Sequence, residues 1–245
     1  MGYQTQQCKG TTWYLLGAQF ENVTGGALKI DEFIKSPDFV ATTSGTDDSV
    51  QIQVWDYTLG GGKGGYQTYY YLSKGRYDGK MYNNIWATAA SAYDPNVEIR
   101  AGQAVWFKCP NACTITVAGQ VAQTGKKVTV HAKVWNFFAN PYPMDFLING
   151  GKVDWVGILG AGKATSGDDA TVPQIQTWDL TLASGKGGYN TYWYLSKGRY
   201  DGKMYNNVWT TAASAYDPNV KVDVGCGFWY MDPNAEENYE IEFAQ

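Results

Sequence analysis

The sequence predicts an all-β protein of two tandem β-sandwich domains, jelly-roll-like in type and related by internal duplication. Residues 63–97 recur at 186–220, where four exchanges among 35 residues leave 31 identical. Short runs rich in Tyr, Thr and Val, which favour strands, alternate with clusters of Gly, Asp, Asn and Pro, which favour turns. The apolar residues show no convincing periodicity of an amphipathic helix.

The repeat continues more loosely on both sides of this block. At almost the same offset, the matched positions are Trp13 and Trp135, Lys29 and Lys152, Gln51 and Gln174, Trp55 and Trp178, Trp106 and Trp229, and Pro110 and Pro233. A unit of about 110 residues is longer than the repeats of solenoid arrays and has the size of a small domain. We therefore predict two domains: residues 1–121, with an N-terminal extension ahead of the repeat, and residues 122–245.

Within the first copy, the expected strands follow one another at short intervals. They cover residues 51–59, 66–72, 97–107, 113–121 and 127–135. The segments between them include GGGKGG, KGRYDGK, YDPN and CPNA, in which Gly supplies positive φ and Asp, Asn and Pro favour turn positions. Residues 81–91 have room for a short helical turn, but the adjacent Asn83 and Asn84 argue against a long helix.

The near-identity of residues 63–97 and 186–220 indicates a requirement that both copies meet. A packing core alone tolerates volume-conserving exchanges and would be expected to drift. A recent duplication or gene conversion confined to this block would produce the same similarity. We interpret the block as two copies of one surface site, whose candidate residues are Tyr71, Arg76, Tyr77, Tyr82, Asn83, Asn84 and Trp86, with Tyr194, Arg199, Tyr200, Tyr205, Asn206, Asn207 and Trp209 in the second copy.

Composition and charge exclude several classes of partner. The 19 basic and 23 acidic residues give a formal charge of −4 without long runs of either sign, so binding to nucleic acid is not expected. No stretch approaches the roughly 20 apolar residues of a membrane span. The N-terminus, MGYQTQQCKGTTWYLLG, lacks the basic start and long apolar middle of a signal peptide. The 19 Tyr and 10 Trp supply rings for core packing, stacking and protein contacts.

The four cysteines suggest at most one disulfide. Cys109 and Cys113 bracket a short turn between two expected strands, so they are a candidate pair. Cys8 and Cys226 have no counterparts in the other half and are either free or bridged. Zinc is not expected, because the chain has one His and lacks a second ligand pair. Calcium binds clustered oxygen atoms, and its candidate ligands would be Asp78, Asn83 and Asn84 or their repeats. The spacing of these residues does not match an EF-hand loop, so no metal is assigned.

The usual signatures of catalysis are missing from the sequence. There is no GxSxG, P-loop or HExxH motif, and no GxGxxG ahead of a helix. His131 lies in the strand-like VTVHAKVW and is expected to be structural. Glycosidases use paired carboxylates, but the repeated Asp78 precedes Gly and the repeated Asp94 precedes Pro, as turn residues do. We expect a protein that is not an enzyme and that needs no cofactor.

Two segments resemble parts of a known kind of repeat. Residues 135–143 read WNFFANPYP, which resembles the W-N-x-x-G-N-P-Y-P element of tandem β-sandwich repeat domains in secreted and cell-surface bacterial proteins. Residues 97–121 are similar to the closing element of the same repeats, although Ala139 stands where they usually have Gly. The resemblance implies an exported β-sandwich repeat, extracellular or at the cell surface, with no known catalytic role. The block at 63–97 lies outside the generic pattern.

Two functions from different classes fit these observations. The first is a structural subunit that self-assembles, as a homo-oligomer or polymer, into an extracellular filament or surface layer through the duplicated Tyr- and Gly-rich patches; residues 1–10 are a further strand for a neighbour. The alternative is a bivalent carbohydrate-binding or adhesion protein, in which the candidate Tyr and Trp stack on sugar rings and the Asn and Arg bind hydroxyl groups. The direction in which the repeated aromatic side chains point separates the two.

Overall fold

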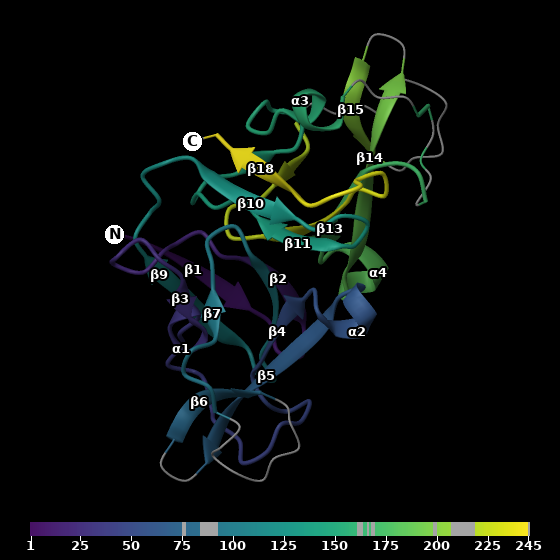
Figure 1. Ribbon diagram of the computed structural model, residues 1–245. Coiled ribbons are helices and arrows are strands. Elements are labelled where there is room, and N and C mark those ends of the chain that lie inside the picture. The colour runs from purple at the N-terminus through teal and green to yellow at the C-terminus, as the bar shows by residue number, and fades with distance from the viewer. Residues whose placement is uncertain are drawn as a thin grey trace.

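A computed structural model of the protein shows a mostly β fold (Figure 1) and describes residues 1–74, 77–83, 93–160, 164–165, 167, 170–197, 200–206 and 219–244. The all-β class is thereby confirmed. The helices are single turns: α1 (Ile30–Phe33), α2 (Leu59–Gly62), α3 (Trp155–Leu159) and α4 (Leu182–Gly185). Among the described helices, none has the length and apolar character that a membrane crossing requires.

Two five-stranded antiparallel sheets form the frame of the molecule. The first has the order β2 (Trp13–Gly17), β8 (Ala104–Lys108), β4 (Gln51–Asp56), β5 (Gly65–Lys74) and β6 (Tyr77–Asn83). The second has the order β11 (Asn136–Ala139), β17 (Gly227–Met231), β13 (Gln174–Asp179), β14 (Gly188–Lys197) and β15 (Tyr200–Asn206). The two orders match strand for strand. We call residues 1–121 the N-terminal half and residues 122–245 the C-terminal half.

Four two-stranded antiparallel sheets accompany the large ones. They are β1 (Gly2–Cys8) with β9 (Cys113–Gly119), β3 (Leu28–Lys29) with β7 (Glu98–Ile99), β10 (Lys126–Val130) with β18 (Tyr239–Phe243), and β12 (Phe146–Leu147) with β16 (Lys221–Val222). The pair β1–β9 occupies in its half the place that β10–β18 occupies in the other. The residues expected as an N-terminal extension are therefore the first strand of the N-terminal half, and they pair within their own chain.

Each half has its own apolar core on the inner face of its large sheet. In the N-terminal half, Ile52 and Phe107 of that sheet are fully buried and belong to one cluster with Ile115 of β9. In the C-terminal half, Ile175 and Tyr230 are buried in the same way. Alternate strand residues point to opposite faces, so the intervening residues of both sheets form an outer face.

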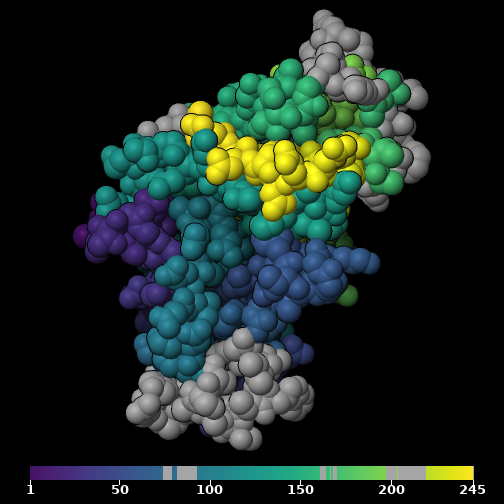
Figure 2. All heavy atoms as spheres, viewed as in Figure 1, coloured from purple at the N-terminus to yellow at the C-terminus, as the bar shows by residue number. Residues whose placement is uncertain are grey.

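The outer faces meet between the halves, and short backbone contacts fix the meeting point. The Gly17 N–H donates to the Gly225 carbonyl, and the Ala139 N–H donates to the Gly102 carbonyl, each at 2.8 Å. Gly17 matches Ala139 in the repeat, and Gly102 matches Gly225, so the two bonds are equivalent. The halves are therefore related by an approximate two-fold axis. The space-filling view shows the blue residues around α2 lying directly against the teal and yellow C-terminal half (Figure 2).

Candidate functional site

The structure describes the side chains of two of the fourteen residues predicted from the repeated block, and both turn inward. Tyr194 is 3 % exposed, and its hydroxyl donates to the Gly160 carbonyl at 2.5 Å. Tyr71 is half-buried, and its ring centroid lies 5.5 Å from that of Phe39 at the edge of the N-terminal core. These two residues therefore contribute to the core, contrary to the expectation of a surface site.

For six further candidates, the structure places the backbone in an edge strand. Those six are Tyr77, Tyr82 and Asn83 in β6 and Tyr200, Tyr205 and Asn206 in β15. The remaining six, Arg76, Asn84, Trp86, Arg199, Asn207 and Trp209, lie outside the described residues.

Two further pairs of matched side chains in the repeated block also face the interior. Tyr69 and its counterpart Tyr192 are 8 % and 7 % exposed and belong to the two cores. Leu72 and its counterpart Leu195 are buried as well. For these pairs, the interpretation of the repeat as two copies of a surface is wrong, because packing inside each half accounts for the matched side chains.

The β5–β6 and β14–β15 hairpins, which carry much of the block, lie at opposite ends of the molecule (Figure 1). In each large sheet, β6 or β15 is the last strand of the order. The Met81 N–H donates to Asp31 Oδ1 at 2.8 Å, so it points away from β5. Because backbone direction alternates along a strand, the N–H and C=O groups of Asn83, two residues further on, face the same open edge.

A cluster of tryptophan and tyrosine residues fills the contact between the two halves. Trp55 of the N-terminal half meets Trp229 of the other edge to face, with ring centroids 4.9 Å apart at 84°. Trp106 and Trp178 make the equivalent contact at 4.9 Å and 88°. Such perpendicular pairs contribute about 0.5–1.5 kcal/mol each beyond the area that they bury. The cluster is therefore a substantial part of what joins the halves.

Two tyrosines complete this cluster and hold its tryptophans in place. The Trp106 indole N–H donates to the Tyr66 hydroxyl at 3.0 Å, and Tyr189 forms the equivalent hydrogen bond with Trp229. Burial raises the pKa of Tyr66 to about 12 and raises the pKa of Tyr189. Both rings nevertheless keep open surface, 41 % for Tyr66 and 43 % for Tyr189.

Twin pockets open beside the cluster, one on each side of the approximate two-fold axis. One encloses about 290 Å³ and is lined by Trp13, Gln53, Tyr66, Trp106, Trp178 and Tyr189. The other encloses about 230 Å³ and is lined by Trp135, Gln176, Tyr189, Trp229, Trp55 and Tyr66. Each residue of the first has its repeat counterpart in the second. The twin pockets are thus a site that the chain builds twice.

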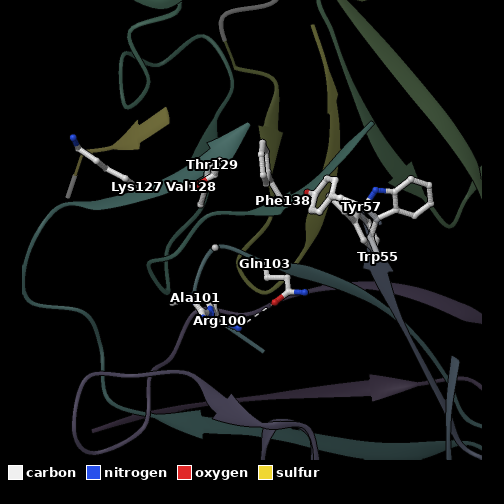
Figure 3. A pocket seen from close by; sticks show the side chains of 11 residues that line it. Trp55, Tyr57, Arg100, Ala101, Gln103, Lys127, Val128, Thr129 and Phe138 are labelled. Carbon is white, nitrogen blue, oxygen red and sulfur yellow. Dashed lines mark hydrogen bonds between the residues drawn. The ribbon is translucent and has the colours of Figure 1, made fainter. Parts of the chain in front are cut away.

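A third pocket, of about 250 Å³, lies between the halves, and its lining residues differ from those at the matched positions of the repeat (Figure 3). Tyr57 and Trp55 stand at one end, and Arg100 and Gln103 line it from the N-terminal half. The repeat places Leu180 opposite Tyr57 and Asp223 opposite Arg100, so the chemistry of this pocket is not duplicated. Tyr57 also stacks on His131, with ring centroids 3.7 Å apart.

The cysteines are all free thiols in the structure, so the bridge expected between Cys109 and Cys113 is not formed there. Cys8 and Cys113 are direct neighbours across the β1–β9 pair, and their thiols are hydrogen-bonded. Burial raises the pKa of Cys8 to about 11 and that of Cys226 to about 11. Within the part of the chain that the structure describes, no three acidic, His or Cys side chains are grouped as metal ligands.

Comparison with protein-family models, with curated proteins and with solved structures gives no match.

The sequence analysis did not predict the twin pockets, although the tryptophans that line them are matched between the two halves. In the sequence, three matched pairs of tryptophans indicated only how far the repeat extends: Trp13 and Trp135, Trp55 and Trp178, and Trp106 and Trp229. Large rings that stay matched where the surrounding sequence has drifted mark a shared contact. Here that contact lies between the two halves, with open pockets beside it.

Proposed function

We propose that the protein is a non-enzymatic structural subunit, built of two β-sandwich domains related by internal duplication, that self-assembles into an extracellular filament or surface layer. The observation that carries this proposal is the position of the β5–β6 and β14–β15 hairpins at opposite ends of the molecule (Figure 1). The extracellular setting follows from the resemblance to exported repeats.

The edge strands supply the means of association. The strands β6 and β15 have the same sequence, YDGKMYN, and each pairs with one neighbour in its sheet. An edge strand presents unpaired N–H and C=O groups with which another chain can continue the sheet. Two equivalent edges at opposite ends let every subunit join two others, which produces an open chain rather than a closed pair.

Side-chain contacts restrict where this pairing can start. Asp31 accepts the hydrogen bond of the Met81 N–H, so that group is not available to a neighbour. Asn83, which faces the open edge two residues after Met81, remains as a position for strand addition. Tyr69 and Tyr71 of β5 turn toward the core. The proposed contact is therefore backbone pairing at the edge strands and no longer the Tyr-rich strand faces.

The proposal is tested by blocking one or both edges with proline. Asn83→Pro removes an N–H that faces outward and leaves the pairing between β5 and β6 in place, and Asn206→Pro is the matched change in β15. Light scattering and negative-stain electron microscopy should show polymers for the native chain, dimers for either single variant, and monomers for the double variant.

The two single variants are each other's control, and circular dichroism checks that all variants are folded. A native chain that stays monomeric at high concentration and forms no polymer on the grid would overturn the assembly proposal. Polymers that persist in the folded double variant would show that assembly uses another surface.

A further inference from the structure

The twin pockets have a lining that selects for an uncharged ligand. Each is lined by three Trp, two Tyr and one Gln side chain, with no Asp, Glu, Lys or Arg. A phosphate, carboxylate or ammonium group would lose its hydration there without gaining an ion pair. Lys108 Nζ lies 5.7 Å from the centroid of the Trp13 ring, but it is paired with Asp47, so the lining disfavours nucleotides and charged peptides. It suits a molecule with one apolar face and hydroxyl groups around its rim.

We propose that each of the twin pockets binds one neutral pyranose ring of a carbohydrate. The C–H face of such a ring packs against the flat apolar surface of an aromatic side chain, which the half-buried indole of Trp13 offers in one pocket and that of Trp135 in the other. Trp106 and Trp229 line the same pockets but are buried. The inference is independent of the proposed assembly, because it uses no residue of the edge strands.

The single amide of each pocket supplies the polar half of the recognition. Gln53 stands in one pocket and its counterpart Gln176 in the other. An amide side chain carries both donors and an acceptor, and a sugar hydroxyl is likewise donor and acceptor, so the two groups satisfy each other. The hydroxyls of Tyr66 and Tyr189, which line both pockets, add further partners at the shared border.

The hydrogen bonds of the cluster favour a sugar over a proline-rich peptide, the other ligand that aromatic grooves bind. A peptide presents carbonyl acceptors and needs donors, usually indole N–H groups. Here the Trp106 N–H already donates to Tyr66, and Trp229 is hydrogen-bonded with Tyr189. The indole nitrogens of Trp55 and Trp178 have no partner among the described residues, but they are buried and so do not face a ligand. The hydrogen bonds of Trp106 and Trp229 fix these two indoles before a ligand arrives, which reduces the entropy lost on binding.

The size and symmetry of the pockets define the binding mode. Volumes of about 290 and 230 Å³ lie below the roughly 300–1,000 Å³ of pockets for drug-sized ligands, so each fits one ring with its linkages leaving through the open side. The approximate two-fold axis between the pockets places the two rings in opposite directions. Each chain therefore offers two binding sites, each for one sugar ring.

The test is calorimetric titration with neutral oligosaccharides of glucose, xylose and N-acetylglucosamine, chosen after a glycan array. The native chain should bind two equivalents of the responding sugar. Trp13→Ala should leave one equivalent, and Trp13→Ala with Trp135→Ala should weaken binding by at least about tenfold, the change that 1.4 kcal/mol produces.

Two further variants separate lost recognition from lost folding. Gln53→Leu with Gln176→Leu keeps the shape of the pockets and removes the amides, so affinity should fall while thermal stability stays the same. Trp193→Tyr, which introduces the N-terminal counterpart of a buried tryptophan away from the pockets, should leave the affinity unchanged even where it lowers the thermal stability.

Three outcomes would overturn the proposal. They are a glycan array without a responding sugar, undiminished binding in the folded Trp13→Ala and Trp135→Ala double variant, and binding of a proline-rich peptide at this site in place of any sugar. The Asn83→Pro and Asn206→Pro variants should bind sugar as the native chain does, so a failure of assembly and a failure of sugar binding are distinguishable.

Discussion

At the scale of single residues, one aromatic stack connects the halves outside the tryptophan cluster. Tyr57 lies at the end of β4 in the N-terminal half, and His131 follows β10 in the C-terminal half. The rings are nearly parallel, at 21°, and the Tyr57 hydroxyl accepts a hydrogen bond from the backbone of Phe137. Burial raises the pKa of Tyr57 to about 12 and lowers the pKa of His131. Both rings are therefore uncharged at neutral pH.

The chain has one histidine, so the pH dependence of stability near neutrality tests this stack. His131 has a pKa below 6.5 in the folded protein, and the unfolded chain takes up the proton first as the pH falls. The free energy of unfolding should therefore be constant between pH 6.5 and about 8, where the cysteine thiols remain protonated, and should decrease as the pH falls from 6.5 through the folded pKa. Urea unfolding between pH 8 and about 5 measures it.

The control for that measurement is His131→Phe, which keeps a ring against Tyr57 and removes the titrating group. Its stability should be flat over the same range, because the lowered pKa values of Asp145 and Asp179 start from 3.8 and place their titration at lower pH. Equal slopes for the native chain and the variant would contradict the assignment to His131.

At the scale of elements, the turns at α2 and α4 have the same shape and different residues. In α2, Gly60 and Gly61 have φ values of 60° and 68°, and in α4 the matched Ala183 and Ser184 have φ values of 50° and 59°. A residue with a side chain in this left-handed region costs roughly 1–2 kcal/mol. The C-terminal half therefore carries strain that the N-terminal half avoids.

Replacing Ala183 and Ser184 by Gly should relieve this strain. We expect the double variant to gain about 1 kcal/mol in unfolding free energy, because the gain is reduced by the greater freedom of glycine in the unfolded chain. The reverse change, Gly60→Ala with Gly61→Ser, should lose a similar amount. Thermal unfolding of both variants measures the difference, and a shift of the same sign in both would refute the explanation.

Several strands could be predicted from the sequence because their alternation and turns are local. The expected strand at 51–59 is observed as β4, and the one at 66–72 as β5, extended to Gly65–Lys74. The expected strand at 97–107 is divided into β7 and β8, since Gly102 adopts a φ of 90° between them. Residues 1–10 were expected to add a strand to a neighbouring chain, but Gly2–Cys8 forms β1 and pairs with β9 of its own chain, which is distant in the sequence.

The face of a strand could not be predicted where both faces carry rings. In β5, Tyr69, Tyr70 and Tyr71 follow one another, so no alternation shows which side faces the core. The structure turns Tyr69 and Tyr71 inward and Tyr66 outward. The twin pockets could not be predicted either, since the meeting of two outer faces depends on tertiary packing.

At the scale of the whole molecule, two small-residue contacts determine how closely the halves approach. Gly17 lies against its own counterpart, because a Cβ added to it would be 2.6 Å from the Ala139 Cβ. Gly227 lies against its counterpart Ala104, where an added Cβ would be less than 3.0 Å from the Ala104 Cβ. Contacts between a residue and its own repeat mark the approximate two-fold axis.

The contact at Gly227 predicts a pair of compensating substitutions. Gly227→Ala should force the halves apart and lower the unfolding free energy by about 1–3 kcal/mol, the usual cost of overpacking. The double variant with Ala104→Gly should regain most of that loss, because the methyl group has only moved to the other side of the contact. Ala104→Gly alone is the control and should cost about 0.5–1 kcal/mol.

Tryptophan fluorescence reports on the same variants, since the cluster lies beside the contact. Its emission should shift to longer wavelength in Gly227→Ala and return in the double variant. A double variant no more stable than Gly227→Ala alone would contradict this account of the contact.

The alternation of glycine and alanine at the axis also governs which partner each half accepts. Two copies of the N-terminal half, placed in this arrangement, would oppose Ala104 to Ala104 and leave a gap between two glycines. Two copies of the C-terminal half would oppose Ala139 to Ala139 in the same way. At this contact each half thus has one alanine and one glycine, and the pattern is complementary to that of the other half. The duplicated sequence therefore favours pairing between unlike halves over pairing between two copies of one half.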